Sequence, residues 1–162
     1  MLREIVVAAA CISVSVSAGQ AQMLDHLSVA LGYGRQSSYQ HPRFITAEVG
    51  YRFGGGWTIA PTARRATGTG GVGWRVQLSL QRHFGAGWLA PYVGAGPSWT
   101  SEVGERNWSG SEFGAMLLLG ANLRLFQSPT GPVLSAFLEG DGYTHHYATG
   151  QLVAGLRLRF RP

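Results

Sequence analysis

The chain has 162 residues, of which 45% are hydrophobic and 13% charged, and its formal net charge is +5. This length suits one domain with its own core. No apolar run approaches the ~20 residues of a membrane-spanning helix, so no such helix is expected. The 13 basic residues, all arginine, are spread along the chain, which argues against a nucleic-acid-binding patch.

Residues 1–21 predict a cleaved secretory signal. Arg3 precedes an apolar run over residues 5–16, and small residues follow, with cleavage expected after Ala21 or, alternatively, after Ala18. A buried N-terminal strand or helix is the other interpretation. Cys11 is the single cysteine, so the mature domain, residues 22–162, is expected to contain neither a disulfide nor a thiolate metal site.

The rest of the chain divides into segments in which apolar and polar residues alternate, the pattern of half-buried strands. Most of them have about the ~9–11 residues that a tilted strand needs to cross a bilayer. No helix is expected. The predicted strands are residues 27–36, 44–53, 57–66, 72–84, 88–100, 113–126, 133–141 and 149–160.

Each predicted strand has one apolar face and one polar face. In the last strand, Leu156 and Leu158 alternate with Arg157 and Arg159, so the leucines and arginines point to opposite sides. The polar faces also carry many of the 24 glycines. Large charged side chains beside glycines suit the narrow interior of a small barrel. A soluble lipocalin-like barrel, with the apolar face inside, is the alternative.

Turn lengths and aromatic positions favour the membrane barrel. The connections at 54–56, 85–87 and 127–131 are short, and those between them are mostly longer and more polar, as in outer-membrane barrels. Aromatic residues occur beside both the short and the long connections, as two interfacial girdles would require. They are Phe53, Trp57, Phe84, Trp88, Phe126 and Phe160 near the short turns, and Tyr33, Trp74 and Trp99 near the long loops. We therefore predict an all-β, eight-stranded antiparallel up-and-down transmembrane β-barrel, in a bacterial outer membrane.

The chain resembles the small eight-stranded outer-membrane barrel proteins, the group that includes OmpA-, OmpX-, OmpW- and PagL-like barrels. Its closing GLRLRF resembles the β-signal of that group through Gly155, Leu158 and Phe160, which implies insertion by the barrel-assembly machinery. The match departs from the group because Arg161 and Pro162 follow the aromatic residue. PYVGAG (91–96) is also similar to a stretch common in these barrels. The resemblance covers residues 22–162 and implies architecture, because this fold hosts many activities.

The resemblance raises the alternative of a PagL-like enzyme acting on lipid A. In that group a histidine and a serine lie two residues apart on the seventh strand and work with a glutamate. Here that strand, VLSAFLEGD, contains Ser135 but no histidine, so the general base is missing. Ser79 and His83 lie ~13 Å apart along one strand, beyond hydrogen-bond reach. We therefore expect no catalytic residues.

A metal site is the other chemistry considered. His41, Asp141, His145 and His146 belong to the first and last loops or their edges, which are neighbours in a closed barrel. Adjacent histidines in extended chain point in different directions, and solvated loop histidines are the simpler interpretation. No metal and no cofactor are expected.

Inward-facing charges form the most informative group. We interpret them as ion pairs that plug the lumen, because buried charges must be paired or hydrated and eight strands leave room only for side chains. A narrow anion-selective channel or small-ligand binder is the alternative. Glu48 is expected to contact Arg52 or Arg75. The predicted lumen charge network is Glu48, Arg52, Arg75, Arg124, Glu139 and Arg157.

Four further arginines lie near the long-loop rim: Arg35, Arg43, Arg65 and Arg106. Arginine binds phosphate through two parallel hydrogen bonds, and the outer leaflet is rich in lipid A phosphate. These residues are therefore predicted contacts to lipopolysaccharide, with ordinary solvated loop positions as the alternative. The sequence thus predicts a monomeric envelope protein with a structural or interaction role.

Overall fold

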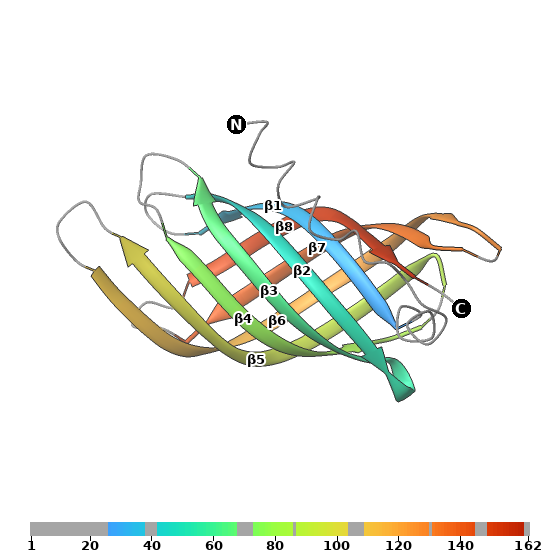
Figure 1. Ribbon diagram of the computed structural model, residues 1–162, viewed down its shortest axis with the longest axis horizontal. Coiled ribbons are helices and arrows are strands. Elements are labelled where there is room, and N and C mark those ends of the chain that lie inside the picture. The colour runs from blue at the N-terminus through green and yellow to red at the C-terminus, as the bar shows by residue number, and fades with distance from the viewer. Residues whose placement is uncertain are drawn as a thin grey trace, which may run out of the picture.

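The computed structural model describes residues 26–37, 42–67, 73–85, 87–103, 109–129, 131–144 and 149–160. Eight antiparallel strands follow one another in chain order and close into a barrel (Figure 1). The predicted fold class is therefore confirmed, and the expected signal, residues 1–21, lies outside the described residues. The strands are β1 (Leu27–Gln36), β2 (Arg43–Phe53), β3 (Trp57–Thr67), β4 (Trp74–His83), β5 (Leu89–Val103), β6 (Ser109–Gln127), β7 (Val133–Tyr143) and β8 (Thr149–Arg159).

All eight predicted strands are present, and the largest difference is in the β5–β6 hairpin. Its pairing continues beyond the predicted ends, from Thr100 opposite Glu112 to Val103 opposite Ser109. Residues 101–112 were expected to form a loop because the apolar alternation stops at Trp99 and Phe113. Backbone pairing needs no apolar side chains, so the hairpin continues past the apolar band.

The short turns are built on glycine. A single 3₁₀ turn, η1 (Gly54–Gly56), joins β2 to β3, and Gly55 and Gly56 have φ values of 71° and 81°. Other residues rarely adopt this left-handed region. Within the described residues, no helix has the length and apolar character needed to cross a membrane.

The barrel is apolar outside and polar inside. Leu117, Leu119 and Leu156 are 67%, 65% and 52% exposed, whereas Gln81 and Arg157 are 1% and 3% exposed. A soluble barrel would bury the leucines instead, so the lipocalin-like alternative is wrong. Arg157 of the closing strand therefore points into the interior, and its neighbour Leu156 points outward.

Interior aromatic rings explain several of the glycines. A Cβ atom at Gly32 would lie 2.9 Å from Cζ of Phe137, and one at Gly155 would lie 2.7 Å from Cε1 of the same ring. Gly120 faces the ring of Tyr92 in the same way. The sequence interpretation assigned this space to long charged side chains, but these glycines accommodate rings, which in turn contact the charges.

Candidate functional site

Arg64 is the centre of a buried polar cluster near the long-loop end of the barrel. Its Nη2 donates to Oε1 of Glu139 at 2.8 Å, and its Nη1 donates to Oη of Tyr143 at 2.7 Å and Oε1 of Gln151 at 2.6 Å. Nη1 also forms an ion pair with the carboxylate of Asp141. These five residues, called the Arg64 cluster below, come from β3, β7 and β8 and therefore join opposite walls of the barrel.

Sequence reasoning missed both Arg64 and Asp141 as members of the lumen network. Strand β3 contains two adjacent arginines, one of which must point inward and one outward. Arg65 was placed at the outer rim, and the alternation from Ile59, an outward residue, would have placed Arg64 inside. Asp141 was considered only as a metal ligand.

A second cluster lies deeper in the barrel. Oε1 of Glu48 accepts a hydrogen bond from Nη2 of Arg157 at 2.9 Å, and its Oε2 accepts from Gln81 at 3.2 Å and Thr62 at 3.4 Å. Nη1 of Arg157 donates to Oδ1 of Asn122 at 2.7 Å. We call these five residues the Glu48 cluster.

The expected partners of Glu48 were therefore wrong. The Cα atom of Arg52 lies four residues along the same strand, ~13 Å from the Cα atom of Glu48. Arg75 instead donates through Nε to Oγ1 of Thr100 at 2.9 Å. The guanidinium of Arg75 also lies 4.0 Å from the centroid of the Tyr143 ring. Arg157 of β8 reaches Glu48 of β2 across the single strand β1 between them, because both residues lie opposite Ala30.

Aromatic residues join the two clusters. Tyr92 donates through its hydroxyl to Oε2 of Glu139 at 2.9 Å, and its ring centroid lies 5.0 Å from the guanidinium of Arg157. The ring of Phe137 lies at the same distance from that guanidinium. Arg157 is thus held by one carboxylate and two rings, and cation–π contacts of this kind strengthen when they are desolvated.

The predicted network is only partly assembled in one place. Glu48, Glu139 and Arg157 lie together through Tyr92, and Arg75 joins the Arg64 cluster through Tyr143. Arg52 and Arg124 are half-buried nearer the short-turn end. There, Nη1 of Arg124 donates to Oε1 of Gln127 at 2.6 Å.

The interior at the short-turn end is almost filled. The space enclosed there is about 10 Å³, no more than one water molecule needs. The residues around it are His26, Ser28, Glu48, Arg52, Thr58, Gln81, His83, Arg157 and Arg159.

The candidate catalytic residues are engaged elsewhere. The His83 ring stacks on Tyr92, with centroids 4.9 Å apart, and Ser79 donates to the carbonyl oxygen of Ala60 at 3.2 Å. In register, Ser135 lies opposite Arg124 and Arg157, neither of which can act as a base. The part of the chain that the structure describes contains no group of three metal-ligating side chains; His41, His145 and His146 lie outside it.

The outer rim carries three of the four predicted arginines. Arg35, Arg43 and Arg65 are all exposed, on the neighbouring strands β1, β2 and β3, and Arg35 lies directly opposite Arg43. The guanidinium of Arg65 lies 5.4 Å from the centroid of the Trp74 ring. Arg106 lies outside the described residues.

The predicted β-signal residues lie on the closing strand and just after it. Gly155 is opposite Gly32, and Leu158 is opposite Val29, on the seam between β8 and β1. The backbone N–H of Phe160 donates to the carbonyl oxygen of Leu27 at 3.0 Å. The motif therefore coincides with the seam that closes the barrel.

No protein-family model matches the chain, and no curated protein matches it. Among solved structures, Neisserial surface protein A is similar with a TM-score of 0.60 and 18% identity, over 83% of this chain and 96% of that one. The N-terminal β-barrel domain of Pseudomonas aeruginosa OprF follows with a TM-score of 0.55 and 22% identity, over 82% and 96%.

A third similar structure comes from the de novo design of transmembrane β-barrels, with a TM-score of 0.54 and 16% identity over 82% of this chain and 93% of the designed one. At such identities the likeness concerns the backbone rather than any site. Together with the apolar exterior and the polar lumen, it shows that the chain has the fold of the small eight-stranded outer-membrane barrels.

Proposed function

We propose that this protein is a monomeric barrel of the bacterial outer membrane with a structural or interaction role, and that its lumen is closed. The observation that carries the proposal is the cross-lumen hydrogen-bonded network inside an apolar exterior. Arg64 connects opposite walls through its ion pairs with Glu139 and Asp141, and Arg157 pairs with Glu48 across the strand β1 that lies between them. An apolar exterior of this kind is stable only where hydrocarbon replaces water.

The same network argues against the channel alternative. An ion crossing the lumen would have to displace Arg64 and Arg157, both only 3% exposed, from their carboxylate partners. Separating such buried pairs is costly because each charge would then be uncompensated. The barrel's contribution to the envelope therefore comes from its outer wall and rims rather than from transport through its centre.

The test uses the full chain expressed in a Gram-negative host. We expect it in the outer-membrane fraction, with the heat-modifiable gel migration of a folded barrel and without unitary conductance steps in planar bilayers. The double variant Glu48→Ala/Arg64→Ala is the comparison, because it removes one member from each cluster. Recovery of the wild type in the soluble fraction would contradict the membrane assignment, and unitary conductance steps from the wild type, of the size that the double variant gives, would contradict the closed lumen.

A further inference from the structure

The outward arginines near the long-loop rim form a continuous basic patch across three strands. Arg35 of β1 and Arg43 of β2 are direct cross-strand partners. Arg65 of β3 lies opposite Ile45, two residues along β2 from Arg43. Like charges directly opposite one another destabilise a sheet, so an anion bound between them would stabilise this arrangement.

The protein itself offers this patch little compensation. None of the described ion pairs involves Arg35, Arg43 or Arg65. The carboxylates of Glu48, Glu139 and Asp141 are buried in the lumen, and the exposed Glu112 lies on β6, away from these three strands. The sequences that connect these strands to their neighbours, SYQH at 38–41 and GTGGV at 68–72, contain no acidic residue. An anion from another molecule would therefore compensate the patch.

The aromatic residues beside the patch show at which depth that anion would lie. Tyr33 precedes Arg35 by two residues on the same face and is 51% exposed, and Trp74, 46% exposed, lies against Arg65. Exposed tyrosine and tryptophan at the edge of an apolar band mark the headgroup level of a membrane. Lipid phosphates lie at this level, and arginine recognises them through paired hydrogen bonds.

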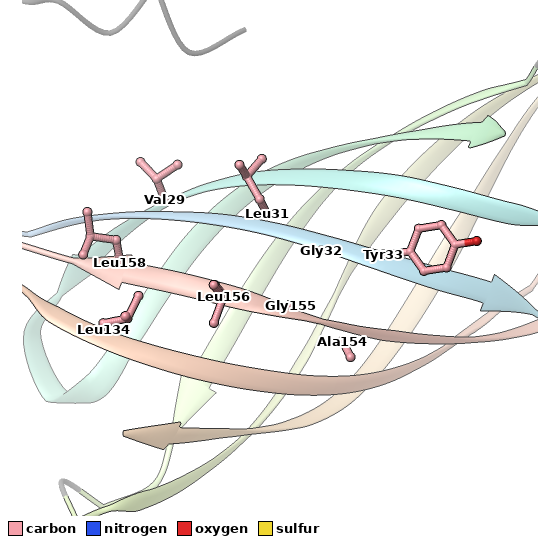
Figure 2. A pocket seen from close by; sticks show the side chains of 9 residues that line it. All are labelled: Val29, Leu31, Gly32, Tyr33, Leu134, Ala154, Gly155, Leu156 and Leu158. Carbon is pink, nitrogen blue, oxygen red and sulfur yellow. The ribbon is translucent and has the colours of Figure 1, made fainter. Parts of the chain in front are cut away.

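An apolar groove continues from this patch along the seam of β1 and β8. It has a volume of about 570 Å³, within the ~300–1,000 Å³ typical of ligand sites. Figure 2 shows Tyr33 at one end of the groove and Val29, Leu134 and Leu158 at the other. The small outward side chain of Ala154, opposite Tyr33, leaves the hollow, and the backbone of Gly32 and Gly155 lies at its floor.

The groove has the dimensions of a lipid chain. From Val29 to Tyr33 the strand runs ~13 Å along its own axis, which at the ~35–45° tilt of such strands is ~10 Å of depth, within the ~15 Å of one hydrocarbon leaflet. Leu31 and Leu156, 59% and 52% exposed, flank it with apolar surface. An acyl chain in the groove would thus end at the level of Tyr33, next to Arg35.

We propose that the rim arginines and the seam groove together form one binding site for a phosphorylated, acylated lipid of the outer leaflet, of the lipid A type. The phosphates would lie against Arg35, Arg43 and Arg65, and one acyl chain would occupy the groove below Tyr33. This inference rests on the proposed membrane position of the barrel and adds a specific partner to it.

The experiment titrates the folded full chain in detergent micelles with lipid A and counts bound lipid by native mass spectrometry. Dephosphorylated lipid A and phosphatidylethanolamine test the phosphate requirement, and inorganic phosphate is added as a competitor. We expect lipid A to bind at least tenfold more tightly than its dephosphorylated form, because each charge-assisted hydrogen bond lost to a phosphate costs about that factor.

The arginine variant is Arg35→Gln/Arg43→Gln, and we expect it to lose that tenfold preference. Its matched control is Arg82→Gln, since Arg82 lies against Trp57, 5.3 Å from the ring centroid, at the opposite rim. If the double variant does not fold, Arg43→Gln alone is expected to weaken binding in the same direction. A double or single variant that folds and binds lipid A like the wild type would overturn the proposal.

The groove variant is Ala154→Phe, which fills the hollow opposite Tyr33, and we expect it to weaken lipid A binding severalfold. Ala95→Phe is its control, on the outward face of β5 between Leu80 and Leu117. Equal binding by both variants would overturn the groove assignment, and full competition by inorganic phosphate would show a free-anion site instead. A separate gel tests the membrane barrel itself: a wild type without heat-modifiable migration would contradict the proposed function rather than the lipid site alone.

Discussion

The carboxylate of Glu48 and the guanidinium of Arg157 meet inside the barrel, over the strand β1 that separates them, with Oε1 and Nη2 2.9 Å apart, although 109 residues separate them in the chain. Arg157 lies on β8 opposite Ala30 of β1, at the seam that makes the sheet a closed barrel. The ion pair therefore depends on closure, and it stabilises the closed form over an open sheet.

Removing Glu48 tests this dependence. Glu48→Ala leaves the buried guanidinium of Arg157 under-compensated, so we expect a loss of roughly 3–5 kcal/mol in the free energy of unfolding. Urea unfolding in detergent micelles measures it. The double variant Glu48→Ala/Arg157→Ala should lose less than the sum of the single variants, because the pair is removed as a unit. A loss of only ~0–1 kcal/mol, typical of hydrated pairs, would mean that water reaches the lumen.

The Arg64 cluster predicts a contrast between two adjacent arginines. Arg64→Met leaves the buried carboxylates of Glu139 and Asp141 without their cation, with an expected loss of about 3–5 kcal/mol. Arg65→Gln, on the outward face, should change the stability in lipid-free detergent by no more than ~0.5 kcal/mol. Adding Asp141→Asn to Arg64→Met should recover part of the loss. Equal losses for Arg64→Met and Arg65→Gln would show that the cluster does not hold the barrel together.

The close approach at the β1–β8 seam predicts a different cost for two glycines. A Cβ at Gly155 would overlap the carbonyl oxygen of Leu31, which is backbone and cannot move aside, whereas a Cβ at Gly142 would meet no atom within 4 Å. Gly155→Ala should therefore cost ~1–3 kcal/mol, as overpacking does. Gly142→Ala should be nearly neutral. Urea unfolding compares the two, and equal midpoints would mean that the seam widens without cost.

The strands and their faces could be predicted because both follow from local alternation. Leu156 and Arg157 fall on opposite sides whatever the partner strands are. The partner of Glu48 could not be predicted, because it depends on the register of β1 with β2 and, through barrel closure, with β8, and local alternation does not determine either register. The role of Gly120 was misread for the same reason, since the ring of Tyr92 reaches it from the neighbouring strand β5.

Orientation in the membrane can be tested by single-cysteine labelling with a lipid-soluble probe. Leu78, Leu119 and Leu156 are 43%, 65% and 52% exposed, whereas Gln77 and Arg157 are 2% and 3% exposed. Cysteines at the three leucine positions should react. Cysteines at Gln77, Gly120 and Arg157 should not, because their side chains would point into the lumen. Equal labelling of both sets would contradict the membrane-barrel arrangement.

The end of the closing strand predicts an effect on assembly rather than on stability. The backbone N–H of Phe160 donates to Leu27 and so adds one more link between the chain ends, and its ring is half-exposed at the short-turn rim. Phe160→Ala keeps the backbone bond but removes the aromatic end of the proposed β-signal, so the folded, heat-modifiable fraction in outer membranes should fall. Phe126→Ala is the matched control, an exposed aromatic near the same end of the barrel that lies outside the signal. A smaller folded fraction for Phe160→Ala alone supports recognition of the signal by the assembly machinery. An equal decrease for both variants indicates the loss of a general interfacial anchor. An unchanged folded fraction for Phe160→Ala shows that the aromatic end of the strand is dispensable.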